Sequence, residues 1–546
     1  MKFAKTGALL LLPCALSACA HLTMDPAPAT PQVAVAEAEA EADAAMAPVA
    51  PLDYDAALRR TMQAYDSTGM VAAVSIDGKT VWQGAEGLAE EGTNRPVTQD
   101  MLFPIASISK AFTTTALAML VERGEVKWDE PIRTYIPEFA MYDPWVSEHF
   151  TVRDALTHRS GLPLGAGDLL IWPDGNAEPE DVIKALPLLR PSAGFRSEYA
   201  YDNLLYVVAG EIIERVSGKS WADFVTDEIL RPVGMDRCVA DKSRIPAGAS
   251  FVTGHERAAG ADAGVPIDER LAFSETWNAA GGIWCDTAGM MKWGNFWLDG
   301  GVTEDGTRLL DERQVREVWQ GVTPTGVNGR LRAAGLSHLS AYALGWSTQD
   351  FAGRLLVSHG GGAPGVVSNF MIIPEDDIVL FSATNDYRGA PSTLNYHVAV
   401  ALLGHPEYDF ISDWGGAFAE AEAEGTKLIA DTAASAPENA APPSLPLSAY
   451  VGIYRDPWYG NVVIRMNDNG GLFIDMGRSE ILDGDLTHYD GNRFAAFWPD
   501  SSLKADAFVD FKVENGKVTG MTMKAISDLT DFSYDFHDLD LTRVED

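Results

Sequence analysis

The chain has few basic side chains for its length. Its 546 residues include 41 lysines and arginines against 78 aspartates and glutamates, which gives a formal net charge of −37. No basic stripe that could neutralise phosphates is visible, so we expect no nucleic-acid partner. The apolar run Ala8 to Leu16 is too short to span a bilayer. With 46% hydrophobic residues, the chain can still form one large globular domain and a smaller one.

Cysteine is also scarce, with four in the whole chain. Cys14 and Cys19 lie at the start, which leaves Cys238 and Cys285. One disulfide is possible between them in an oxidising compartment, but the sequence leaves the pairing open. No zinc spacing occurs, since His255-Glu256 lacks the second histidine of a zinc-protease helix. We expect no metal and no organic cofactor. A G-x-S-x-G nucleophile elbow is missing too, which argues against an α/β-hydrolase.

Residues 1–19 are typical of a bacterial lipoprotein signal peptide. Lysines precede the apolar run, and residues 16–19 (Leu-Ser-Ala-Cys) resemble a lipobox, in which Cys19 is lipidated and becomes the first residue. Ordinary leader cleavage after Ala20 is the alternative. Ala20 in place of aspartate favours the outer membrane, so we expect a periplasm-facing lipoprotein that meets the membrane only through its lipid. Residues 20–52, rich in Ala, Glu and Pro, are expected to form a tether.

An α+β domain is predicted for residues 53–405. A helical stretch, 52–68, precedes two strands joined by Asp77-Gly78, a strong hairpin signal. Residues 151–230 are mainly helical, with capping patterns at Thr151 and Ser220. Further strands are predicted at 341–347, 354–358, 366–373 and 378–384, before a helix at 391–403. Strands at both ends of one domain predict a single antiparallel sheet flanked by helices, with a helical insert.

A small all-β domain is predicted for residues 447–546, after a helical and Pro/Ala-rich linker at 406–446. Its strands are expected at 450–454, 461–466, 472–475, 493–497, 507–513, 517–523 and 532–541. This spacing favours a small barrel or curled sheet. Its aromatic residues could line a ligand cup, but packing in a core is the preferred interpretation; they are Trp458, Tyr459, Phe473, Phe494 and Phe497.

The first candidate catalytic motif is Ser107-x-x-Lys110, at the start of a predicted helix. Positions i and i+3 lie on one helix face, so the lysine amine can reach the serine hydroxyl. A desolvated lysine can take the proton of a serine and activate it as a nucleophile. Ser109 points to a different face and is expected to pack or cap. The spacing alone is weak evidence, because Ser501-x-x-Lys504 repeats it.

The second candidate motif is Tyr201-x-Asn203. A nearby lysine ammonium can lower the pKa of a tyrosine phenol enough for it to exchange protons with a serine. The asparagine amide can bond both the lysine and a substrate amide. This spacing also recurs by chance, at Tyr459-x-Asn461.

The third candidate motif is His359-Gly360-Gly361-Gly362, expected at the end of the strand 354–358. Glycines there allow a substrate backbone to lie along the strand edge and leave an amide free for an oxyanion. Gly360 to Gly365 also matches a loose dinucleotide-binding fingerprint. That interpretation is discounted because Ala363-Pro364 interrupts the turn and a strand follows it.

In this order, the three motifs resemble those of the penicillin-recognising serine hydrolases, in the branch with class C β-lactamases, DD-peptidases, D-aminopeptidases and related esterases. Residues 156–163, 279–282 and 342–346 resemble further recurring stretches of that family. The resemblance implies a covalent acyl-enzyme on Ser107, with Lys110 and Tyr201 as proton shuttles and Asn203 orienting Lys110 and substrate. It also implies an oxyanion hole from the amides of Ser107 and Gly362, with Gly361 beside the substrate.

His359 departs from the lysine that class C β-lactamases usually carry. Histidine is largely neutral near pH 7, so it offers no fixed charge to a substrate carboxylate. A peptidase or esterase is therefore at least as well supported as a β-lactamase, on a small-molecule or peptide substrate. A catalytically silent lipoprotein that binds cell-wall peptide is the alternative. Residues 450–454 resemble the start of a lipocalin-like domain appended to some of these hydrolases. The oligomeric state stays open.

Overall fold

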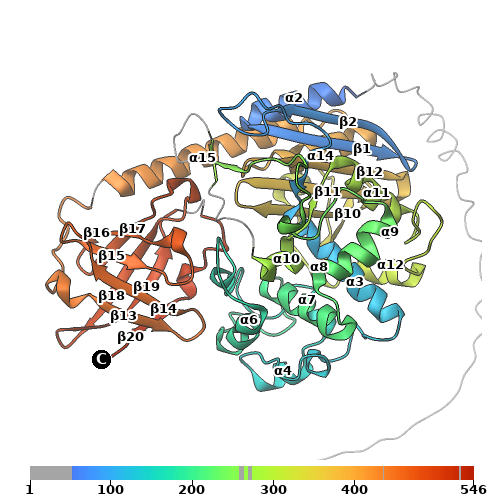
Figure 1. Ribbon diagram of the computed structural model, residues 1–546. Coiled ribbons are helices and arrows are strands. Elements are labelled where there is room, and N and C mark those ends of the chain that lie inside the picture. Colours follow the sequence, from blue (N-terminus) through green and yellow to red (C-terminus); the bar gives the residue numbers. More distant parts are fainter. Residues whose placement is uncertain (1–51, 258–263, 268–273, 435, 528–529, 546) are drawn as a thin grey trace, which may run out of the picture. The chain divides into compact units, whose positions relative to one another are not determined.

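An antiparallel sheet of eight strands lies at the centre of the larger domain, as the sequence predicts (Figure 1). The computed structural model describes residues 52–257, 264–267, 274–434, 436–527 and 530–545, so the expected signal peptide, the lipidation site Cys19 and almost all of the tether lie outside the described residues. The strand order is β2-β1-β12-β11-β10-β9-β8-β7. The strands are β1 (Gly69–Ile76), β2 (Lys79–Gly87), β7 (Thr323–Pro324), β8 (Ser340–Tyr342), β9 (Ser347–Phe351), β10 (Arg354–Ala363), β11 (Val366–Ile373) and β12 (Ile378–Thr384).

The two ends of this domain meet as neighbouring strands of the sheet. β1 pairs antiparallel with β12, with Met70 opposite Thr384. β1 and β2 form the expected hairpin, because Asp77 and Gly78 both adopt positive φ, at 51° and 70°, as a tight two-residue turn requires. The single strand predicted at 341–347 is wrong. It is split into β8 and β9 by a turn in which the Ala343 amide donates to the Trp346 carbonyl at 2.7 Å, and Gly345 has a φ of 74°.

Helices cover both faces of the sheet, so β1 is buried on both sides. Met70, Ala72 and Val74 belong to one core cluster, whereas Val71 and Ala73 belong to the other, as the alternation of a strand dictates. The first cluster packs against α2 (Tyr54–Tyr65), α14 (Ala390–Leu402) and α15 (Phe410–Ala434) (Figure 1).

The second face carries the helices of the insert and the helix expected to hold the nucleophile. The expected caps form: the Thr151 hydroxyl takes part in a capping box with Asp154, and the Ser220 hydroxyl accepts from the Asp223 amide. The helices are α3 (Ser109–Glu122), α4 (Pro144–His149), α5 (Val152–Ala155), α6 (Pro179–Ala185), α7 (Leu204–Ser217), α8 (Trp221–Val225), α9 (Arg231–Val233), α10 (Asn278–Gly281), α11 (Thr287–Leu298) and α12 (Glu312–Trp319). The short helix α13 (Gly329–Ala333) instead contributes Leu331 to the first cluster.

Two short strand pairs complete the domain. β3 (Phe103–Pro104) pairs with β6 (Trp284–Cys285), with Phe103 opposite Cys285. β4 (His255–Glu256) pairs with β5 (Val265–Pro266). A disulfide joins Cys238 to Cys285, which answers the question that the sequence left open. It ties the segment after α9 to the strand pair that leads into Ser107.

The C-terminal domain is a closed eight-stranded barrel. Closure comes from β13 and β20, where Tyr454 lies opposite Arg543. The strands are β13 (Gly452–Asp456), β14 (Gly460–Met466), β15 (Leu472–Asp475), β16 (Gly484–Asp490), β17 (Arg493–Phe497), β18 (Ala507–Glu514), β19 (Lys517–Ala525) and β20 (Asp540–Arg543). Trp458, Tyr459 and Phe494 are buried in its core, which supports the packing interpretation for these three.

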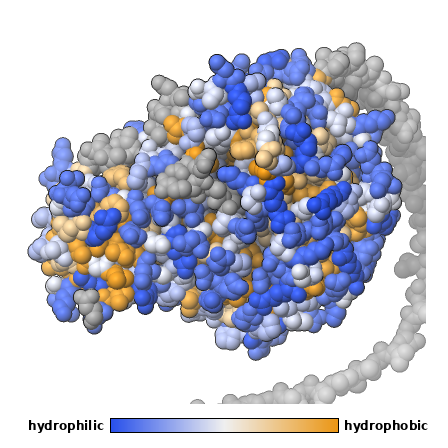
Figure 2. Space-filling view, in the orientation of Figure 1, coloured by the Kyte–Doolittle hydropathy of each residue, from blue (hydrophilic) through white to orange (hydrophobic). Residues whose placement is uncertain are grey.

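The strands of this barrel differ from the prediction in two places. β16 was missed, and the strand predicted at 532–541 begins only at Asp540. Residues 531–535 instead contact the larger domain, as described below. Among the described helices, none combines the length and hydrophobicity of a membrane span. The face seen in Figure 2 is largely hydrophilic, with hydrophobic surface gathered over part of the barrel.

Candidate active site

Ser107 lies in a single 3-10 turn, Ala106–Ile108, that leads directly into α3. The approach is fixed by the Ile105 amide, which donates to the Ile283 carbonyl at 2.9 Å. Ser109 is buried, and its hydroxyl accepts from the Ile283 amide at 3.1 Å. Ser109 therefore holds the segment in place, and Ser107 alone of the two serines lines the cleft.

Lys110 is fully buried beneath Ser107. Its Nζ donates to Asn203 Oδ1 at 2.8 Å and to the Ala280 carbonyl at 2.9 Å. It also lies 3.0 Å from Ser107 Oγ, to which the ammonium form donates and from which the neutral amine accepts. Burial lowers the pKa of Lys110 to about 7, against the opposing charges of Asp168 and Asp202. A substantial fraction of this lysine is consequently neutral near pH 7, as a general base must be.

Tyr201 lies on the same side of the cleft, with its ring centroid 4.8 Å from Lys110 Nζ. Desolvation by its surroundings raises the pKa of Tyr201 well above the usual value, and a hydrogen bond to Ser107 only partly opposes this. The sequence-based expectation that the lysine lowers the pKa of this phenol is therefore wrong. Tyr201 stays a neutral hydroxyl, able to donate a proton but poorly suited to remove one.

Asn203 precedes α7 and connects the lysine to a residue that the sequence reasoning missed. Its Oδ1 accepts from Lys110, and its Nδ2 donates to Asp168 Oδ2 at 2.8 Å. Asp168 is fully buried, and burial raises the pKa of its carboxyl to about 8. One amide proton of Asn203 is thus held by Asp168. No motif spacing marks Asp168, because it meets Asn203 only in the folded chain.

His359 lies within β10, not at its end, because this strand continues to Ala363. His359 Nδ1 lies 2.6 Å from the Gly360 carbonyl and Nε2 lies 2.8 Å from the Tyr342 hydroxyl. A carbonyl only accepts, so Nδ1 carries the proton and Nε2 accepts from Tyr342. Burial, with the charge of Lys110, lowers the pKa of His359 to about 3. The histidine is neutral and offers no cation to a substrate.

The three glycines of β10 face different surroundings. Gly360 and Gly362 line the cleft. Gly361 faces the other way, since a Cβ placed on it would lie 2.1 Å from the Ile105 carbonyl oxygen. Gly361 is therefore needed for close packing against the turn that carries Ser107, and it does not line the cleft as expected. Gly362 remains available at the position expected for the oxyanion hole.

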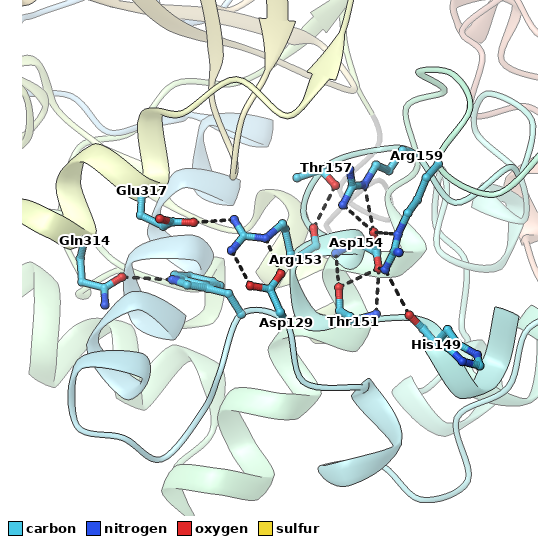
Figure 3. Close-up of polar contacts among 11 residues, drawn as sticks. Asp129, His149, Thr151, Arg153, Asp154, Thr157, Arg159, Gln314 and Glu317 are labelled. Carbon is cyan, nitrogen blue, oxygen red and sulfur yellow. Dashed lines mark hydrogen bonds and ion pairs between the residues drawn. The ribbon is translucent and has the colours of Figure 1, made fainter. Parts of the chain in front are cut away.

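A buried carboxylate, Asp154, holds the segment that leads to Tyr201. Figure 3 shows Asp154 between Thr151 and Arg159. Its Oδ1 accepts from Arg159 at 2.9 Å, and its Oδ2 accepts from Arg196 at 2.6 Å. These contacts lower the pKa of Asp154 in spite of its burial. The side chain thus stays ionised and connects the start of the insert to the approach to Tyr201.

His158, next to this network, was noted in the sequence only as part of a family-like stretch. Its Nδ1 accepts from the Asp202 amide at 3.1 Å, and its ring centroid lies 4.2 Å from that of Tyr201. Burial lowers the pKa of His158 well below its usual value. It supports Tyr201 as a neutral side chain.

The cleft itself has a volume of about 510 Å³ and is lined by residues from both domains. Ser107, Tyr201, Asn203 and His359 line it, with Lys110 beneath them, so the structure brings the three motifs together. Phe532 and Ser533 of the C-terminal domain also line it, which the sequence did not predict.

Among the described residues, Cys238, Cys285 and Asp286 lie close enough to hold a metal ion. The two cysteines are joined in a disulfide, so they are not free to act as ligands.

Comparison with known proteins shows the family of the domain that holds this site. A family model described as Beta-lactamase matches residues 54–404. The chain belongs to the Beta-lactamase family. A second model, described as a domain of unknown function (DUF3471), matches residues 436–543 of this family member, which hold the barrel.

Two curated relatives of this Beta-lactamase family member are hydrolases by name. Unguisins hydrolase ungD' of Aspergillus campestris is 28% identical over 454 residues, which are 77% of this chain and 79% of the relative. D-alanyl-D-alanine-carboxypeptidase/endopeptidase AmpH of Escherichia coli K12 is 26% identical over 324 residues, 58% of this chain and 78% of the relative. Among solved structures, the octameric penicillin-binding protein homologue from Pyrococcus abyssi aligns with a TM-score of 0.57 at 19% identity, over 90% of this chain and 100% of that one. This last likeness shows the fold alone.

The protein is a serine hydrolase of the Beta-lactamase family, and a catalytically silent role is not favoured.

Proposed function

We propose that the protein hydrolyses ester or peptide-type amide bonds through an acyl-enzyme on Ser107, with Lys110 as the general base. The observation that carries this proposal is the buried Lys110 amine, 3.0 Å from Ser107 Oγ and with a pKa lowered to about 7. A neutral amine has two N–H groups and one lone pair. Asn203 Oδ1 and the Ala280 carbonyl accept the two N–H groups, so the lone pair points at Ser107.

The reaction follows from this geometry. Lys110 takes the hydroxyl proton while Ser107 Oγ bonds to the substrate carbonyl carbon, and the carbonyl oxygen becomes an oxyanion held by the amides of Ser107 and Gly362. As the bond to the leaving group breaks, the proton passes to that group through the Tyr201 hydroxyl. Water then attacks the ester on Ser107 with Lys110 again as the base, which releases the acid and restores the hydroxyl.

The charges around the cleft support a neutral substrate over one with a carboxylate beside the scissile bond. Among the described residues that line the cleft, none is a lysine or arginine, His359 is neutral, and Asp531 is acidic. A carboxylate would lose its hydration here without gaining a cationic partner. We therefore place esters and peptide amides ahead of β-lactams and of peptides cleaved at a free C-terminus.

A panel of matched substrates tests this proposal. The purified protein is assayed with para-nitrophenyl acetate, benzylpenicillin, a D-alanyl-D-alanine peptide and the C-terminal amide of the same peptide. We expect turnover of the ester and of the amide, with kcat/KM for the amide at least about tenfold above that for the free acid, as expected for one unpaired charge. Ser107→Ala must abolish each activity. Faster turnover of penicillin or of the free-acid peptide would contradict the proposed substrate class.

The proposal includes export and lipid attachment at Cys19, with the protein facing the periplasm from the outer membrane. Its support is the residue pattern at the start of the chain, together with the Cys238–Cys285 disulfide, which is typical of oxidising compartments. Mass spectrometry of the mature N-terminus and membrane fractionation test it. We expect a lipidated Cys19 and, in Cys19→Ala, release from the membrane; an unmodified N-terminus beyond Cys19 would contradict it.

A further inference from the structure

The segment Thr530–Asp535 of the C-terminal domain enters the active site. The sequence predicts a strand here, but β20 begins only at Asp540. The Asp535 carboxylate anchors the segment, accepting from the Gly167 amide at 2.6 Å and from the Leu169 amide at 3.0 Å. These two amides flank Asp168. The segment is thereby fixed beside the residue that holds Asn203.

A chain of hydrogen bonds runs from this segment to the lysine. Ser533 Oγ donates to Asp168 Oδ2 at 2.8 Å, and Asn203 Nδ2 donates to the same oxygen at 2.8 Å. Asn203 Oδ1 accepts from Lys110 at 2.8 Å. Each of these side chains is buried, so water competes little for the bonds.

The orientation of the Asn203 amide decides whether the lone pair of neutral Lys110 is available to Ser107. With Oδ1 towards Lys110, the amide takes one lysine N–H and leaves the lone pair for Ser107. If the amide were flipped, Nδ2 would face Lys110 as a donor and would compete for that lone pair. Asp168 prevents the flip as long as the oxygen facing Asn203 is an acceptor.

We propose that Ser533 is a positioning residue of the catalytic base: it keeps Asp168 Oδ2 an acceptor, so that Asn203 presents its oxygen to Lys110. This inference deepens the proposed function and rests on it. Through Ser533, the barrel domain becomes part of the machinery that activates Ser107.

The state of Asp168 explains why a second donor is needed. Burial raises the pKa of this carboxyl to about 8, so both its ionised and its protonated forms are populated near neutral pH. Asp168 Oδ1 has no hydrogen-bond partner among the described residues. Two donors at Oδ2 leave the proton on Oδ1. Without Ser533, the proton can move to Oδ2 and turn it into a donor towards Asn203.

The test compares serine variants in the full chain. Ser533→Ala removes the donor, and Ser533→Cys keeps the size of the side chain with only a weak donor. We expect both to lower kcat for para-nitrophenyl acetate, and the rate at which a fluorophosphonate probe labels Ser107, by about tenfold with KM within about twofold, as for one lost buried hydrogen bond. Ser533→Thr, which keeps the hydroxyl, should recover to within about threefold.

Ser502→Ala provides a matched control. Ser502 is 2% exposed and Ser533 is 3% exposed, and Ser502 also donates to a carboxylate, Asp500 at 2.5 Å, but within the barrel. This variant should retain the parent kcat. An unchanged kcat in both Ser533→Ala and Ser533→Cys, or an equal loss in Ser502→Ala, would overturn the inference while leaving the proposed function intact. If the parent protein showed neither labelling of Ser107 nor turnover, the proposed function would fail first, and the positioning role with it.

Discussion

The motif Ser107-x-x-Lys110 and its copy Ser501-x-x-Lys504 share one spacing, and both serines lie in a single 3-10 turn, but the two lysines differ in burial and in their contacts. Lys110 is fully buried and bonded to Ser107, Asn203 and Ala280. Lys504 follows a three-residue turn and itself has a φ of 51°. Its Nζ lies 3.9 Å from Glu422. Ser501, by contrast, is exposed. Burial and two fixed acceptors, not spacing, turn a lysine into a base.

Substitution of each lysine should separate the two copies most strongly. Lys110→Met keeps the length of the side chain but removes the base, and we expect kcat/KM for an ester to fall by about 10³-fold, within the range of lost general-base catalysis. Lys504→Met should change it by less than about threefold. Steady-state kinetics on both variants measure the difference. Equal losses would mean that Lys110 acts only by supporting the fold.

Loss of the disulfide should destabilise the domain that holds the first copy, Ser107-x-x-Lys110. Cys238 and Cys285 are 47 residues apart in sequence, so their link stabilises the folded chain by about 2–4 kcal/mol in the loop-entropy account. The double variant Cys238→Ala/Cys285→Ala should therefore unfold at a lower urea concentration. Tryptophan fluorescence measures the transition, and the parent protein in reductant should behave like the double variant. An unchanged midpoint in both would show that the bond does not stabilise this domain.

The pH profile tests the environment of Lys110. Below a pKa of about 7 the lysine is protonated and is no longer a base, so kcat/KM should fall about tenfold per pH unit below pH ~6 and level off above pH ~8. The charged or titratable groups facing it are Asp168, Asp202, Tyr201, Tyr206, His158 and His359.

A neutral ester is the substrate for this profile, so that only the enzyme titrates. Of the facing groups, Asp202 has a pKa raised to about 7, and its ionisation overlaps that of Lys110. Asp202→Asn removes this overlap and should move the acid limb to lower pH, since a negative neighbour stabilises the ammonium. An acid limb centred near pH 4 in the parent would contradict a base with the pKa of about 7 found for Lys110.

The smallest effect is expected at Phe532. This side chain is 38% exposed, lines the cleft and meets the Tyr201 ring edge-on at 5.8 Å. Phe532→Ala should raise KM about threefold with little change in kcat, because the ring contacts bound substrate and transition state alike. Phe508→Ala, on another barrel aromatic that contacts Tyr489 and Arg493, is the control. A drop in kcat alone would show that Phe532 acts on the chemistry through Tyr201.

The sequence predicts the sheet, the hairpin at Asp77-Gly78 and the grouping of the motif residues, because these depend on local patterns and on the order of motifs. It fails where the decision depends on distant parts of the chain. The pKa of Tyr201 follows from desolvation by its neighbours, and Asp168 gains its role only by meeting Asn203. Residues 532–538 alternate like a strand, yet Asp535 finds its partners, the amides of Gly167 and Leu169, in the other domain. Gly361 lies in a glycine run that is typical of an oxyanion loop, but a glycine is required there for packing against Ile105.

The most direct test of the account is to trap the acyl-enzyme. The protein is mixed with para-nitrophenyl acetate, quenched in acid within milliseconds to seconds, digested and mapped by mass spectrometry. The account predicts one acetyl group on Ser107 in the parent protein, slower to form in Lys110→Met. An acetyl group on any other residue, or an equally rapid adduct on Ser107 in Lys110→Met, would contradict it.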